Sequence, residues 1–273
     1  MKVIHAAFLL GFSDYYLPLT LDQQVFTERF FGPEGNTLEH SFIALDGEDP
    51  VGLILGGIRQ FDGLKTMRCG GFCIAPDYRG RGISDKLFQL HSSAAIAEGC
   101  EQLFLEVLKV NSRAIRFYEK QGYQAVDTLE YYTGEASALP PLSIAPACTV
   151  EAISFGTLQA FRESLTDCHI NWQCDPPFYA TSTDSALLAA LDEDHRQIAL
   201  IAMSKQGQIN LLWVDPLRRR QRLGLFMIAE AAARQHTEKL NVCLTGSAAL
   251  GGYFQALGFG KLEVEQIEMH LPL

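Results

Sequence analysis

The chain has 273 residues, of which 48% are hydrophobic and 20% charged, so it can bury a large core in one or two domains. Its formal net charge of -10 argues against nucleic acid or an anionic membrane as the main partner, since either requires a basic surface, and it suits a cationic substrate. Seven irregularly spaced cysteines favour reduced thiols and a cytoplasmic location, and no apolar run reaches the ~20 residues that span a bilayer.

The first forty residues predict a short strand and two helices. Residues 2–4 are compatible with the strand, and a helical segment follows through Phe12. Thr20 and Gln23 have the spacing of a capping box for a second helix, which Gly32 ends. The connection between the two helices is aromatic.

Three strand-like runs come next, at residues 41–45, 51–61 and 66–74. Asp62 and Gly63 predict a tight hairpin between the last two. Gly70 and Gly71 interrupt the third run, which predicts a bulge or a close approach of something to the backbone.

The stretch from residue 74 to 84 joins that third strand to an amphipathic helix. Pro76 ends the strand because it has no amide donor. A glycine-rich turn that opens a helix exposes unpaired backbone amides in a positive potential, which favours an anion. Gly80 and Gly82 would let a phosphate approach the backbone, and Arg79 and Arg81 could add charged contacts. An ordinary exposed turn is the alternative.

A strand and a short helix follow this turn. Alternation predicts a strand at residues 102–110, in which Glu106 shares a face with apolar neighbours. Asn111 is placed to cap a helix through Tyr118 that ends at Gly122.

The turn at residues 79–84, followed by Asn111 and the run from residue 117 to 123, resembles the GNAT superfamily of acyl-CoA-dependent N-acyltransferases. Two motifs in this order and separation are far more specific than either alone. The match covers about residues 1–133, and it departs from the family pattern at Ser84, a small residue that can still begin the helix.

This resemblance implies a binding site for acetyl-CoA. The pyrophosphate would rest on the turn, and the pantetheine arm would pair with the preceding strand like an added strand. The positions that correspond to these contacts are Phe72, Cys73, Ile74, Arg79, Gly80, Arg81, Gly82, Ile83, Ser84 and Asn111.

The resemblance also implies two catalytic roles. Tyr118 occupies the position of a family tyrosine that protonates the departing CoA thiolate, the alternative being a core tyrosine with a satisfied hydroxyl. Glu106 is the candidate base that removes a proton from the amine, because burial would raise its pKa; the alternative is a carboxylate paired with a nearby Arg or Lys, with water removing the proton. No metal is expected, and an acyl-cysteine on Cys69 or Cys73 is disfavoured.

The second half repeats the turn and helix-end motifs of the first half. Residues 214–219 echo residues 74–79, and residues 253–259 echo residues 117–123, which predicts two tandem GNAT-like α/β domains, each a mostly antiparallel sheet flanked by helices. The expected boundaries are 1–133, a linker at 134–146, and 147–273. Aligned without gaps from Pro216, Arg220 and Arg222 replace Gly80 and Gly82. Aligned on the terminal glycine of the second motif, Phe254 replaces Tyr118, Ser247 replaces Asn111 and Val242 replaces Glu106. A shifted alignment would instead use Gly224 as the motif glycine.

The sequence therefore predicts an N-acetyltransferase that acts on the primary amine of a small molecule or peptide by direct transfer. The second half would be mainly structural and could close the substrate side. Tyr15, Tyr16 and residues 30–36 would contribute to the acceptor site. A non-catalytic acyl-CoA-binding module is the alternative, and the sequence does not determine the oligomeric state.

Overall fold

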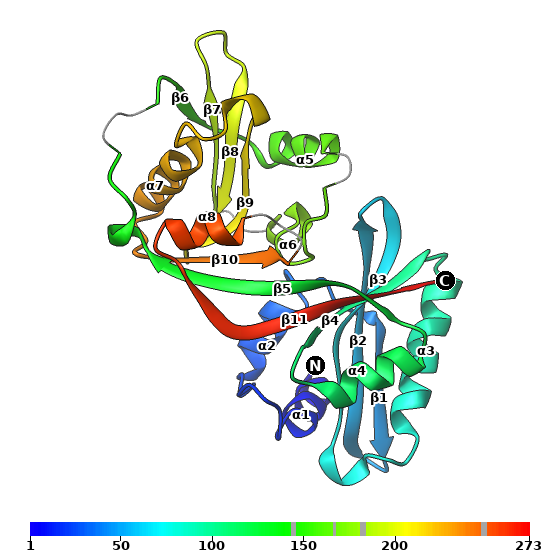
Figure 1. Ribbon diagram of the computed structural model, residues 1–273. Coiled ribbons are helices and arrows are strands. Elements are labelled where there is room, and N and C mark those ends of the chain that lie inside the picture. Colours follow the sequence, from blue (N-terminus) through cyan, green and yellow to red (C-terminus); the bar gives the residue numbers. More distant parts are fainter. Residues whose placement is uncertain (143–145, 166–167, 181–183, 247–249) are drawn as a thin grey trace. The chain divides into compact units, whose positions relative to one another are not determined.

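The computed structural model describes residues 1–142, 146–165, 168–180, 184–246 and 250–273. It contains two compact units (Figure 1): the first comprises Met1–Asp127 with Gln266–Leu273, and the second comprises Thr128–Glu265. The expected boundaries differ from this division in three ways. Residues 128–133, expected in the first domain, lie in the second unit. The end of the chain lies in the first unit, and residues 134–135 continue a strand rather than begin a linker. Residues 143–145 of the expected linker lie outside the described residues.

The first unit follows the predicted order of elements closely. Its elements are α1 (Lys2–Gly11), α2 (Gln23–Phe30), β1 (Thr37–Asp46), β2 (Asp49–Phe61), β3 (Leu64–Ile74), the 3-10 turn η1 (Pro76–Tyr78), α3 (Ile83–Ala97), β4 (Gln102–Leu108), α4 (Ser112–Lys120), the start of β5 (Gln124–Glu135) and the end of β11 (Gly260–Pro272).

The sheet of the first unit has the order β1-β2-β3-β4-β11. Only the β3–β4 pair is parallel. Strand β2 alternates between two cores: Leu53 and Leu55 pack with Phe8 of α1 and Phe26 of α2, whereas Ile54 packs in the core that α3 and α4 share. Each fully buried side chain of this kind contributes ~1.5–3 kcal/mol. The helices therefore cover both faces of the sheet and hold β3 between them.

The hairpin and the bulge predicted around β3 are both confirmed. Asp62 and Gly63 have φ angles of 49° and 81°, as a tight turn of the I′ type requires. Leu55 pairs with Gly71 and the next residue, Gly56, pairs with Cys69, so Gly70 is the extra residue of a bulge.

The prediction for the amino terminus is wrong in two places. Residues 2–4 begin helix α1 rather than a strand, because Ile4, Ala7, Phe8 and Gly11 form one buried helical face. The cap of α2 is Asp22 instead of Thr20, since a carboxylate oxygen of Asp22 accepts the Val25 N–H at 2.9 Å.

The second unit has the same architecture. Its elements are the rest of β5, the 3-10 turn η2 (Ala136–Ala138), β6 (Thr149–Ala152), α5 (Phe155–Ser164), α6 (Pro176–Tyr179), β7 (Ala186–Leu191), β8 (Gln197–Met203), β9 (Gln208–Val214), the 3-10 turn η3 (Pro216–Arg218), α7 (Leu223–Gln235), β10 (Lys239–Thr245), α8 (Gly251–Ala256) and the start of β11.

The two sheets share one pattern of strand directions. In the second unit the order is β5-β10-β9-β8-β7-β6, and among the residues described there only the β9–β10 pair is parallel. The strand beside β10 is β5, and the strand beside β4 in the first unit is β11, so each unit is completed by a strand that follows the other half in sequence. The repeat predicted from the sequence is therefore a repeat of fold. Among the described residues, no helix is long and apolar enough to cross a membrane.

Candidate active site

A turn with two left-handed glycines connects β3 to α3. After η1, Gly80 and Gly82 have φ angles of 75° and 76°, and Gly82 is the N-cap of α3. A β-carbon at either glycine would meet no atom within 4 Å, so the space in front of the backbone is open. The first helical hydrogen bond runs from Lys86 N–H to the Gly82 carbonyl, so the amides before it are available to an anion.

The sheet opens beside this turn. Strands β3 and β4 pair in parallel only from Thr66 with Gln102 to Arg68 with Phe104. Both strands continue beyond that point, β3 to Ile74 and β4 to Leu108. The backbone of β3 from the bulge to the turn thus faces a gap that an extended chain could enter.

A cavity of about 370 Å³ lies at this opening. From the predicted binding residues it is lined by Phe72, Cys73, Ile74, Arg79, Gly80, Ile83, Ser84 and Asn111, and it is also lined by Tyr118. Arg81, Gly82 and Glu106 are not among its lining residues. The connection after α1 adds Asp14, Tyr15 and Tyr16, and α4 adds Arg113.

Tyr118 is buried at the inner wall of this cavity. It lies on α4, with a relative exposure of 8%. Burial, followed by the neighbouring thiol of Cys69, raises its pKa well above the usual value, and its hydroxyl hydrogen-bonds to that thiol. Tyr118 is therefore protonated at neutral pH and has a proton to give.

The two thiols of β3 are also protonated. Burial raises the pKa of Cys69 to about 12 and raises the pKa of Cys73 further. The Cys73 thiol faces the Ala7 carbonyl of α1 at 3.7 Å. Neither sulfur is a ready nucleophile, because the thiolate is the reactive form.

The motif arginine Arg79 is committed to protein partners. Its Nη1 and Nη2 contact the two carboxylate oxygens of Asp14 at 2.5 and 2.6 Å. Its Nε donates to the Ile74 carbonyl at 3.0 Å, and Nη2 also donates to the Gly11 carbonyl at 3.3 Å. Arg79 thus links the end of α1, and the connection that follows it, to the turn.

Tyr15, which follows Asp14 in the chain, also lines the cavity. Its hydroxyl interacts with the side chain of Asn111, whose Oδ1 accepts the Ala114 N–H at 3.2 Å and caps α4. No sequence motif marks Asp14 or its pairing with Arg79. The aromatic composition of the connection was the only signal available for Tyr15.

Glu106 lies outside the cavity, in the buried interior of the same unit. Its Oε2 is 2.5 Å from Arg68 Nη2, and its side chain is 1% exposed. Burial raises the pKa of Glu106, while the charge of Arg68 opposes that rise. The pairing matches the structural alternative for this carboxylate, and the role of Glu106 as a base stays a prediction.

The corresponding turn of the second unit has the same left-handed backbone conformation but no glycine at the two positions. Arg220 and Arg222 have φ angles of 65° and 61°, and Arg222 is the N-cap of α7. Gly224 lies inside α7, where an added β-carbon would be 2.6 Å from the Tyr253 hydroxyl oxygen. The alignment without gaps therefore matches the backbone, and long side chains occupy the positions of Gly80 and Gly82. Ser247, aligned with Asn111, lies outside the described residues.

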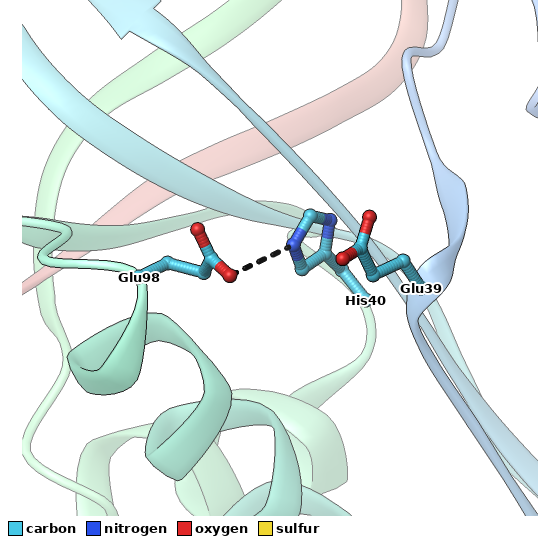
Figure 2. Close-up of side chains that lie close together, drawn as sticks. All are labelled: Glu39, His40 and Glu98. Carbon is cyan, nitrogen blue, oxygen red and sulfur yellow. Dashed lines mark ion pairs between the residues drawn. The ribbon is translucent and has the colours of Figure 1, made fainter.

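A second group of polar side chains lies away from the cavity, where Glu39, His40 and Glu98 approach one another (Figure 2). His40 Nε2 is 3.9 Å from Glu98 Oε1, and both glutamates are exposed. Lys65 Nζ, 4.0 Å from the other oxygen of Glu98, already supplies a cation there. This group therefore has the character of a surface ion-pair cluster.

Comparisons with known proteins match the part of the chain that contains this site to acetyltransferases. The model of the Acetyltransferase (GNAT) family matches residues 5–123. An acetyltransferase of Pectobacterium atrosepticum is 36% identical over 79 residues, which are 29% of this chain and 53% of that protein. The chain thus spans about half the length of such curated relatives.

Two solved structures show the same fold over most of the chain. A GCN5-related N-acetyltransferase from Sphaerobacter thermophilus matches with a TM-score of 0.69 and 14% identity, covering 99% of this chain and 90% of that one. A tandem GNAT protein from the clavulanic acid biosynthesis pathway matches with a TM-score of 0.61 and 12% identity, covering 85% and 82%. Residues 5–123, all in the first unit, are therefore similar to the Acetyltransferase (GNAT) family, and the fold of most of the chain is similar to that of a tandem GNAT protein.

Proposed function

We propose that the first unit transfers the acetyl group of acetyl-CoA to a primary amine of a small molecule or peptide, by direct attack within a ternary complex. The observation that carries the proposal is the convergence, on one cavity, of the turn before α3, the unpaired backbone of β3 and the protonated Tyr118. The turn would bind the pyrophosphate of acetyl-CoA, the unpaired backbone of β3 would pair with its extended pantetheine arm, and Tyr118 would protonate the departing thiolate.

The residues present fit acetyl-CoA. Gly80 and Gly82 leave open space before the amides at the start of α3, where the helix dipole also favours a phosphate. Phe72, Cys73 and Ile74 would pair with the pantetheine arm as an added strand. Arg81, Ile83, Ser84 and Asn111 complete the proposed contacts, while Arg79 would act mainly by holding the turn in shape. When bound, acetyl-CoA supplies an activated thioester.

The chemistry requires two proton movements. The amine nitrogen forms a bond to the acetyl carbon, and the carbon–sulfur bond breaks. Tyr118 would give its hydroxyl proton to the departing sulfur and be reprotonated through solvent by the proton that the new amide nitrogen loses. An amine with a pKa near ~10.4 is protonated at neutral pH and must first lose another proton. Because Glu106 lies outside the cavity, it is the proposed acceptor through water.

The second unit would be a structural partner without its own acetyl-CoA site. The positive-φ arginines at the start of α7 place side chains where the first unit leaves space. The net charge of -10 favours a cationic acceptor over nucleic acid or an anionic membrane. A cytoplasmic location is proposed because all seven cysteines are unbridged thiols.

The test is acetyl-CoA-dependent release of free thiol with a panel of primary amines, comparing the wild-type protein with Tyr118→Phe. Turnover that depends on both the amine and Tyr118 is expected. Binding of acetyl-CoA without turnover on any amine would instead favour a non-catalytic acyl-CoA-binding module.

A further inference from the structure

A buried cluster of charges lies where β3 and β4 separate. Arg68 is the last residue of β3 that pairs with β4, and Glu106 lies two residues beyond the last paired residue of β4. Glu34, from the connection between α2 and β1, meets the same guanidinium. All three side chains belong to the first unit.

The geometry of the cluster is tight. Arg68 Nη1 contacts Glu34 Oε2 at 2.6 Å, and Nη2 and Nε contact Glu106 Oε2 at 2.5 and 3.0 Å. The three side chains are only 5%, 6% and 1% exposed for Glu34, Arg68 and Glu106. Water therefore screens these charges little, and their interaction is strong.

The two oxygens of Glu106 have different surroundings. Oε2 takes both contacts from Arg68, whereas Oε1 is buried and has no hydrogen-bond partner among the described residues. A buried polar atom without a partner is costly and calls for an explanation, of which a catalytic role is one. An oxygen held in place with an unused lone pair is suited to accept a proton.

We propose that Arg68 is a positioning residue for the acetyl transfer: it holds Oε2 of Glu106, keeps that carboxylate ionised at the opening of the sheet, and so leaves Oε1 as the proton acceptor. This inference rests on the proposed function and on the proposed role of Glu106. Glu34 holds Arg68 from the other side, and Arg29 in turn contacts Glu34 at 3.4 Å.

The charged groups around Glu106 act in opposite directions. Burial raises its pKa most, Arg68 lowers it, and Glu34 and then Glu268 raise it. Glu268 is the cross-strand neighbour of Glu106 on β11 and is fully buried. Removing Arg68 and removing the charge of Glu34 should therefore move the titration of Glu106 in opposite directions.

The experiment compares Arg68→Met with Glu34→Gln in the full chain. The carboxyl titration of Glu106 is followed by 13C NMR on glutamate-labelled protein, assigned with Glu106→Gln, and the acidic limb of kcat/KM is measured with the best amine of the panel. Both readouts should move to higher pH in Arg68→Met and to lower pH in Glu34→Gln. Arg68→Lys, which keeps the charge, should restore most of the wild-type position.

A loss of folding alone cannot give this result, because both variants break the same ion-pair cluster. Arg162→Met is the matched control, since it breaks a partly buried ion pair of 3.0 Å with Asp175 in the second unit and should leave both readouts unchanged. Shifts in the same direction, or an unmoved titration in Arg68→Met, would overturn the inference. An inactive wild-type protein would refute the proposed function, while the NMR titration would still decide whether Arg68 controls the ionisation of Glu106.

Discussion

The glycine at the start of α3 offers the most direct perturbation of the proposed acetyl-CoA site. Gly82 has a φ of 76°, and a methyl group there would project into open space. Gly82→Ala should therefore fold, at a cost of about 1–2 kcal/mol for a left-handed alanine. If the methyl group removes one charged hydrogen bond to phosphate, worth about 1.5–3 kcal/mol, the Kd for acetyl-CoA should rise about 10- to 100-fold.

Gly63 provides a matched control. It has a φ of 81° in the hairpin between β2 and β3, and an added β-carbon there also meets no atom within 4 Å. Gly63→Ala should lose a similar amount of stability in chemical unfolding while its Kd for acetyl-CoA, measured by calorimetry, stays at the wild-type value. Equal Kd values for the two variants would refute the argument that this turn binds the phosphates.

Three further predictions concern single side chains. Tyr118→Phe should reduce kcat about 100- to 10,000-fold with little change in the Kd for acetyl-CoA, because only proton transfer to the sulfur is lost. An unchanged kcat in the thiol-release assay would exclude Tyr118 as the acid. Asp14→Asn removes an anion from the cavity, while the carbonyls of Ile74 and Gly11 still hold Arg79. Because about 1 kcal/mol of repulsion is lost, calorimetry at low salt should show an acetyl-CoA Kd about fivefold lower than that of the wild type. A higher Kd would contradict this. Burial first, and then the charge of His40, lowers the pKa of His91 from 6.5 to about 4. The neutral His91 therefore contributes to stability above pH 6.5, and this contribution, about 3 kcal/mol, is lost as the pH falls toward 4. Urea unfolding of His91→Leu should lack that part of the pH dependence, and an unchanged dependence would show that another group causes it.

The local features of the first unit were predictable because single residues determine them. Proline and glycine restrict or widen the backbone choices at Pro76, Gly63 and Gly70, and the structure has the strand end, the hairpin and the bulge at these residues. The start of α1 was missed because Val3 and Ile4 favour a strand locally, whereas burial of one helical face decides the outcome.

The contacts that the sequence did not predict are distant along the chain. Asp14 and Arg79 are 65 residues apart, and Arg68 and Glu106 are 38 apart. The pairing of β11 with β4 joins residues more than 150 positions apart, such as Met269 with Leu105. Charge and periodicity identify such residues as polar or buried, but only the fold determines which of them meet.

The central claim is that the chain has one acetyl-CoA site and that it lies in the first unit. The most direct measurement is the calorimetric stoichiometry of acetyl-CoA binding to the wild-type protein, to Gly82→Arg, which gives the first turn the residue of the second, and to Arg222→Gly. We predict one acetyl-CoA per chain in the wild type and in Arg222→Gly, and none in Gly82→Arg. Two sites per chain, or a single site that survives in Gly82→Arg, would contradict the account.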